Sequence, residues 1–191
     1  MCGRYTLFSH KTVPEAQRLW QALTNTAPAV PVPKGDIAPS EYAPVYVAGD
    51  KNGRTATVMK WGYPNPRRKT LIINARSETL IQKETFREDF LNQRCLVPAE
   101  GFYEWTPEKK LFVFEGSDSS LIYLAGIYRK AGDRREFVIL TREPVSLVAE
   151  IHNRMPVIIP EDQAEAWLYD TNAALELIRT APPELVRRCV K

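Results

Sequence analysis

Short runs of apolar and β-branched residues, separated by prolines and polar turns, dominate the pattern along this chain. Such runs are typical of β-strands, whereas apolar residues that recur every three or four positions indicate amphipathic helices. The pattern predicts strands over residues 2–8, 43–47, 55–61, 71–73, 95–97, 101–105, 111–115, 121–128 and 136–141. It predicts helices over residues 14–23, 85–92, 145–151, 161–168 and 173–179.

The order in which strands and helices follow one another indicates an α+β fold. A parallel sheet needs a crossover, usually a helix, between successive strands, whereas here several strands follow each other directly. The fifteen prolines fall mostly between the short strands, and we find no internal repeat or long linker. We therefore expect residues 1–191 to form a single α+β domain with a curled, largely antiparallel, barrel-like sheet and several peripheral helices.

Composition narrows the class of protein. Apolar residues make up 44% and charged residues 26% of the chain, which suits a globular domain that buries its own core. Two histidines and three cysteines are too widely separated for a zinc-finger spacing, so we expect no metal and no cofactor. Without an apolar run of ~18 residues or a signal peptide, we expect a cytoplasmic protein with reduced thiols and no membrane partner. A net charge of +3 permits nucleic-acid binding without arguing for it.

The second residue carries the most informative chemistry. Cysteine follows the initiator methionine, and aminopeptidases remove Met1 when the next side chain is small. Cys2 is then expected to begin the mature chain, with an α-amine (pKa ~8) and a thiol (pKa ~8.5) that are both partly nucleophilic at neutral pH. Such a residue captures an aldehyde twice, because the amine forms an imine and the thiol then closes a five-membered thiazolidine. The alternative is an ordinary cysteine near a chain terminus.

Blocks of sequence spread over nearly the whole chain extend this hypothesis. They are MCGRYT at 1–6, WG at 61–62, INARSET at 73–79, RCLVPAEGFYEW at 94–105 and IHNRMPVI at 151–158. In this order they closely resemble the SOS-response-associated peptidase (SRAP) family of abasic site processing proteins. The resemblance implies a protein that binds single-stranded DNA at abasic sites and links to them covalently through the N-terminal cysteine, which shields the lesion.

The resemblance places three further residues in an active site with Cys2. Glu104 is expected to move protons, His152 to assist the opening of the sugar ring, and Asn74 to orient the amine or the sugar by hydrogen bonding. Local sequence leaves other interpretations open. Glu104 also fits a solvent-facing strand residue, His152 a helix C-terminal or partly buried histidine, and Asn74 a turn residue.

Arginines that flank these blocks are expected to hold the DNA. Arg4, Arg76 and Arg154 each lie two residues from a reacting residue, which puts them on the same face where the backbone is extended. Each guanidinium then has the reach to clamp a phosphate, although a solvated surface arginine is the alternative. Trp61 is expected either to stack on an unpaired base or to pack in the core.

The sequence leaves other functions open. Cys2 also suits an N-terminal-nucleophile hydrolase or cysteine peptidase with His152 as its base, and the chain also suits a non-catalytic single-strand-binding module. The resemblance allows self-removal of Met1 and strand cleavage by β-elimination, as in an abasic-site lyase. Asp36 stands where the family usually has asparagine, close to the expected DNA cleft. We expect a monomer, located at the nucleoid when bound to damaged DNA.

Overall fold

A closed barrel forms the centre of the structure, a computed structural model that describes residues 2–9, 13–26, 33–50 and 53–190. Its strands are β3 (Tyr42–Ala48), β4 (Arg54–Trp61), β8 (Arg94–Ala99), β11 (Ile122–Ala131) and β12 (Arg134–Arg142). They follow one another in the order β12-β4-β3-β8-β11, and the pairing of β11 with β12 closes the ring. The barrel confirms the expected α+β fold with a curled sheet.

Most of the barrel pairs are antiparallel, but β12 also has parallel neighbours. Along β12, first β4 and then β7 (Asn74–Arg76) pair in parallel, with Phe137 opposite Trp61 and Ile139 opposite Asn74. The short strands β13 (Met155–Pro156) and β14 (Ile158–Ile159) pair with β12 and β11. A separate hairpin consists of β5 (Tyr63–Pro64) and β6 (Leu71–Ile72).

A second sheet packs beside the barrel and carries the N-terminal segment. Its order is β15-β10-β9-β1-β2, with bounds β1 Tyr5–Leu7, β2 Gly35–Ile37, β9 Gly101–Trp105, β10 Leu111–Gly116 and β15 Leu185–Cys189. β1 pairs antiparallel with β9, and the Tyr103 N–H donates to the Arg4 carbonyl at 3.0 Å, which extends this pairing toward Cys2. A Cβ on Gly101 would lie 2.7 Å from the Phe114 carbonyl oxygen, so the close approach of β9 and β10 requires glycine there.

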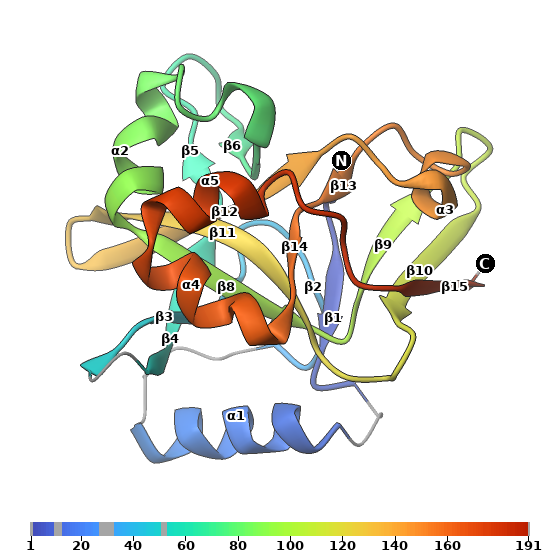
Figure 1. Ribbon diagram of the computed structural model, residues 1–191, viewed down its shortest axis with the longest axis horizontal. Coiled ribbons are helices and arrows are strands. Elements are labelled where there is room, and N and C mark those ends of the chain that lie inside the picture. Colours follow the sequence, from blue (N-terminus) through green and yellow to red (C-terminus); the bar gives the residue numbers. More distant parts are fainter. Residues whose placement is uncertain (1, 10–12, 27–32, 51–52, 191) are drawn as a thin grey trace.

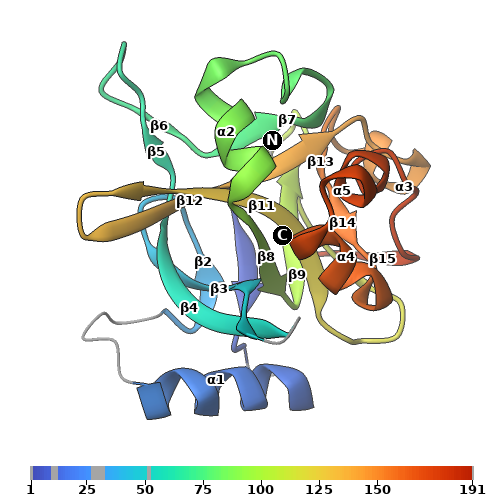
Figure 2. The same ribbon diagram turned by 60° about the vertical axis from the view of Figure 1, so that its left-hand side comes forward.

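Helices cover the outside of the two sheets (Figures 1 and 2). They are α1 (Pro14–Thr26), α2 (Glu84–Asn92), α3 (Ser146–Ala149), α4 (Ala164–Tyr169) and α5 (Thr171–Leu177), with the 3-10 turns η2 (Ser77–Thr79) and η3 (Glu161–Gln163). In Figure 1, α1 lies below the barrel and α2 above it, while α4 and α5 pack side by side. None of the helices in the described part of the chain is long and apolar enough to span a membrane.

The strongly patterned elements match the sequence predictions, with ends that differ by a few residues. The expected helix over 145–151 is shorter, since α3 ends at Ala149, and the expected helix over 161–168 is a 3-10 turn followed by α4. Strands β2, β5, β7, β13, β14 and β15 were not predicted. These strands are short or polar, and they form because a neighbouring strand offers an open edge.

Candidate active site

Cys2 lies in the core just before β1. It has no exposed surface, and its Sγ lies 3.9 Å from the Arg4 carbonyl oxygen. Burial and, next in size, the charge of Glu104 raise the pKa of the Cys2 thiol well above its usual range. In this environment the sulfur holds its proton at neutral pH, so its reaction requires a base.

Glu104 lies on β9, the strand next to the N-terminal segment. Its side chain is only 2% exposed, so the solvent-facing interpretation is wrong. Burial raises the pKa of Glu104 from its ordinary value near 4.5 to about 7. A carboxyl group with this pKa is present in both protonation states at neutral pH, which suits it to give and accept protons.

His152 is positioned by the chain just after α3. Its backbone N–H donates to the Val148 carbonyl at 2.9 Å, and its Nδ1 accepts the Arg154 backbone N–H at 3.0 Å. Partial burial lowers the pKa of His152, which favours the neutral ring at pH 7. The same Nδ1 lies 3.2 Å from the Arg154 carbonyl oxygen, so the Arg154 backbone meets this nitrogen whichever ring nitrogen carries the proton, while Nε2 lies 3.9 Å from Glu104 Oε2.

Asn74 begins β7, so the turn interpretation is wrong. Its Nδ2 lies 3.5 Å from the carbonyl oxygen of Ile139 on β12. Its Oδ1 is buried and has no hydrogen-bond donor among the described residues. The preceding carbonyl, that of Ile73, accepts from Trp61, which in turn packs on Tyr5 of β1. Asn74 therefore has a buried acceptor without a partner among the described residues, at the start of β7.

The flanking arginines differ in how far they are available to DNA. Arg76 is exposed on β7. The Arg4 guanidinium is 40% exposed, lies over the Trp105 ring at 5.2 Å, and is 3.7 Å from the carboxylate of Asp36. Asp36 thus places a negative charge beside an arginine that is expected to hold phosphate.

Arg154 is already engaged by protein groups. Its guanidinium is 11% exposed and makes a two-pronged ion pair with Glu78, at 2.7 and 2.9 Å. It also donates to the Thr141 carbonyl at 2.7 Å. These bonds lower the pKa of Glu78 and hold the segment whose backbone N–H supports His152. Sequence reasoning missed Glu78, although it lies within the INARSET block that signalled Asn74.

Trp61 belongs to the core, and the expectation that it stacks on DNA is wrong. The indole has no exposed surface, stacks on Phe137 at 6.2 Å and donates to the Ile73 carbonyl at 3.0 Å. It follows a strand whose apolar positions face inward, which is the situation that favours core packing.

We expect Trp61→Ala to destabilise the protein by about 3–5 kcal/mol, because it removes a large buried ring and one of the two N–H groups that donate to the Ile73 carbonyl, the other being that of Ile139. Urea unfolding followed by circular dichroism measures this effect. Trp20→Ala is the control, since Trp20 is half-buried on α1 and its loss leaves a smaller cavity. Equal losses for the two variants would contradict the core role of Trp61.

The chain is similar to known proteins over nearly its whole length. The family model described as SOS response associated peptidase (SRAP) matches residues 1–190. The chain is 33% identical over 187 residues to the abasic site processing protein YoqW of Bacillus subtilis (strain 168), which covers 90% of this chain and 82% of that protein. It is 26% identical over 178 residues to the abasic site processing protein YedK of Escherichia coli (strain K12), which covers 88% and 79%.

Solved structures share the fold. A crystal structure of a protein from Bordetella bronchiseptica matches with a TM-score of 0.80 and 25% identity over 100% of both chains. A protein from Bacteroides thetaiotaomicron matches with a TM-score of 0.78 and 21% identity over 100% of this chain and 92% of that chain. The arrangement of barrel and second sheet therefore recurs in other bacterial proteins.

Proposed function

This chain belongs to the SOS response associated peptidase family, and from that premise we propose that it processes abasic sites in single-stranded DNA by linking to them covalently through Cys2. The observation that carries the proposal is the juxtaposition of a buried thiol, a carboxyl group with a pKa of about 7 and a neutral imidazole. Glu104 is the leading charge that acts on the Cys2 thiol, which favours Glu104 as its base.

The reaction begins at the α-amine of Cys2. Met1 lies outside the described residues, and its removal converts the Cys2 backbone nitrogen into a free amine. The nitrogen attacks C1′ of the ring-opened abasic sugar, whose aldehyde oxygen gains a proton to become a hydroxyl group. Loss of this hydroxyl as water gives the imine, and protonated Glu104 is suited to donate the proton that the leaving water needs.

Closure of the thiazolidine ring uses Glu104 again, now as the deprotonated carboxylate. The Cys2 sulfur adds to the imine carbon, the thiol proton moves to Glu104, and the imine nitrogen takes up a proton. One water is lost overall and no oxidant is needed. His152, whose lowered pKa favours the neutral ring, has its Nε2 3.9 Å from Glu104 Oε2 and is suited to hydrogen-bond the sugar oxygen that ring opening releases.

Single-stranded DNA is held by the surface around this site. Arg76 is exposed and Arg4 is partly exposed, so both are suited to bind phosphates beside the reacting groups. Arg154 acts first as a positioning residue, since its guanidinium holds Glu78 and Thr141 while its backbone supports His152. The oxygen of Asn74 is free to accept from the Cys2 amine or a sugar hydroxyl.

We expect purified protein to form a heat-stable, slower-migrating complex with a uracil-containing single strand treated with uracil-DNA glycosylase. The same strand without glycosylase treatment should give no such band, because it offers no aldehyde. Intact mass spectrometry establishes beforehand that Met1 is absent, and afterwards should show the mass of protein plus DNA minus one water. Failure of protein that lacks Met1 to form the complex would refute the proposal.

A further inference from the structure

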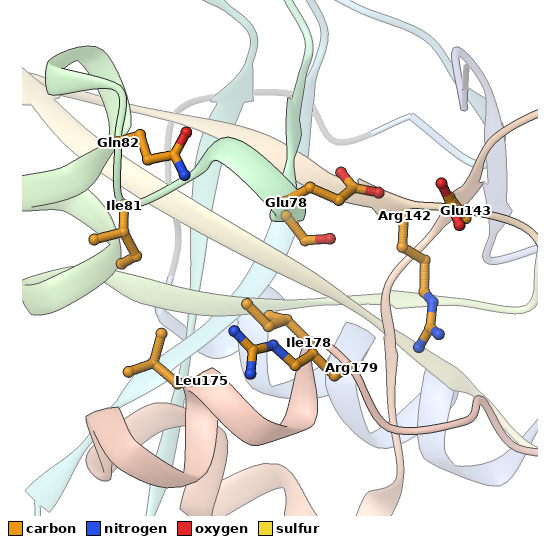
Figure 3. A pocket seen from close by; sticks show the side chains of 9 residues that line it. Glu78, Ile81, Gln82, Arg142, Glu143, Leu175, Ile178 and Arg179 are labelled. Atoms are coloured by element: carbon orange, nitrogen blue, oxygen red, sulfur yellow. The ribbon is translucent and has the colours of Figure 1, made fainter.

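A cavity of about 400 Å³ opens between the turn that follows β7 and the end of α5 (Figure 3). Ser77, Glu78 and Ile81 form one wall, and Leu175, Ile178 and Arg179 form the facing one. We refer to it as the α5 cavity. Its volume lies within the range of about 300–1,000 Å³ that is typical of pockets for small ligands.

The α5 cavity is linked to the candidate active site by residues that neighbour both. Ser77, in its wall, directly follows Arg76, an exposed arginine at the end of β7. Glu78, also in its wall, binds the guanidinium of Arg154, whose backbone N–H donates to His152. A DNA strand with a phosphate at Arg76 therefore has this cavity close to it, because Ser77 in the cavity wall is the next residue.

The lining favours a flat, neutral ligand with polar edges. Ile81 is 36% exposed, and in Figure 3 it lies across the cavity from Leu175, at the left-hand end of the view. Such aliphatic side chains offer a surface on which the face of a ring can pack. The amide of Gln82 and the hydroxyl of Ser77 supply donors and acceptors for the edge of a ring.

The charges at the rim argue against a phosphate deep in the α5 cavity. The carboxylates of Glu78 and Glu143 both line it and repel an anion. Arg142 and Arg179 also line it, and Arg142 donates to the Thr180 carbonyl rather than to a carboxylate. A neutral base inside, with its own phosphate near these arginines, matches this distribution of charge.

We propose that the α5 cavity binds the base of a nucleotide that neighbours the abasic residue on the same strand. The inference rests on the proposed function, because it takes single-stranded DNA at the active site as given. It adds a subsite that recognises intact nucleotides beside the lesion, so the protein reads the flanking strand as well as the abasic sugar.

The test uses a fluorescent single strand with a tetrahydrofuran analogue in place of the abasic sugar. This analogue has no aldehyde, so fluorescence anisotropy reports non-covalent binding independently of the reaction at Cys2. A second strand carries further tetrahydrofuran units in place of the flanking bases. We expect the native protein to bind the second strand about five- to tenfold more weakly, since it has lost a packed base.

Ile81→Asn supplies the discriminating variant, because Ile81 is partly exposed, its replacement leaves the core intact and the amide adds no charge that would repel DNA. We expect it to weaken binding of the base-flanked strand to the level of the spacer-flanked strand, and to leave the latter unchanged. Val190→Asn, at an exposed valine outside the cavity, is the matched control and should retain the preference for flanking bases.

Two results would overturn the subsite. One is equal affinity of the native protein for both strands, and the other is an equal loss for both strands in Ile81→Asn. The crosslinking assay is scored separately with a true abasic strand. Loss of base preference with intact crosslinking rejects the subsite alone, whereas absence of crosslinking with preserved base preference rejects the covalent function alone.

Discussion

Cys2→Ala is expected to abolish the heat-stable complex with abasic DNA completely. After removal of Met1 this variant keeps a free α-amine, which still forms an imine with the sugar aldehyde. Without the thiol the imine cannot close to a thiazolidine, and imines hydrolyse on denaturation. The measurement is denaturing gel electrophoresis of the protein with a glycosylase-treated strand. A residual heat-stable band in Cys2→Ala would show that another residue forms the bond.

Two controls make the Cys2→Ala result specific. Cys189→Ala should crosslink like the native protein, since Cys189 is exposed on β15, which β10 separates from Glu104 on β9. Borohydride added to Cys2→Ala should trap the imine as a stable amine, because the amine is retained. Trapping without spontaneous crosslinking separates the roles of the Cys2 nitrogen and sulfur. Anisotropy with the tetrahydrofuran strand checks that non-covalent binding survives the substitution.

The imine also bears on strand cleavage. Formation of an imine at C1′ makes the hydrogens at C2′ acidic, so β-elimination competes with ring closure. In the proposed reaction the adjacent sulfur has the advantage of an intramolecular attack on the same carbon, which favours ring closure over elimination. The balance between shielding and cleavage of the strand thus depends on how fast the Cys2 thiol adds to the imine carbon relative to the loss of a C2′ proton.

The sequence pattern correctly predicts those strands whose apolar residues are also the ones that the fold buries. Residues 101–105 and 55–61 are rich in aromatic or β-branched residues, and both form strands that contribute to a buried layer. β15 behaves differently, because Arg187 and Arg188 give it a polar pattern and only its pairing with β10 makes it a strand. Such an edge strand has no apolar face for a sequence pattern to reveal.

The candidate site also has features that local sequence indicates and features that depend on long-range contacts. A resemblance to a family grouped Cys2, Glu104 and His152, but nothing local to Glu104 indicates burial, which follows from the pairing of β9 with the N-terminal segment and β10. The ion pair of Arg154 with Glu78 joins residues far apart in sequence, so spacing alone left Arg154 as a free phosphate ligand. In both cases the decisive contact is long-range.

Glu104→Gln is expected to slow crosslinking by about 10²–10⁴-fold, the usual contribution of a positioned acid–base group. Glutamine keeps the size and hydrogen bonding of the side chain but neither donates a proton to leaving water nor accepts one from the thiol. Single-turnover rates on abasic DNA measure the effect. A rate within a few-fold of the native one would show that Glu104 does not transfer protons.

The pH dependence distinguishes proton transfer from a structural role of Glu104. Its pKa of about 7 predicts a native rate that falls at acidic pH, as the amine is protonated and Glu104 loses its basic form. The native rate should fall again above pH 7, where Glu104 no longer donates to water. Glu104→Gln should lose the alkaline fall and rise until the amine is deprotonated near pH ~8.

The stability of the same variant supplies the control for folding. Because the folded state raises the pKa of Glu104, it keeps a proton that the unfolded chain releases between the ordinary value near 4.5 and about 7. Native stability contributed by this group is therefore present at low pH and lost as pH rises through that window. Glu104→Gln should be at least as stable as the native protein at pH 8 in urea unfolding. A variant that is stable but slow places the loss in the reaction and not in folding, because removal of a buried carboxylate should not destabilise the fold at that pH.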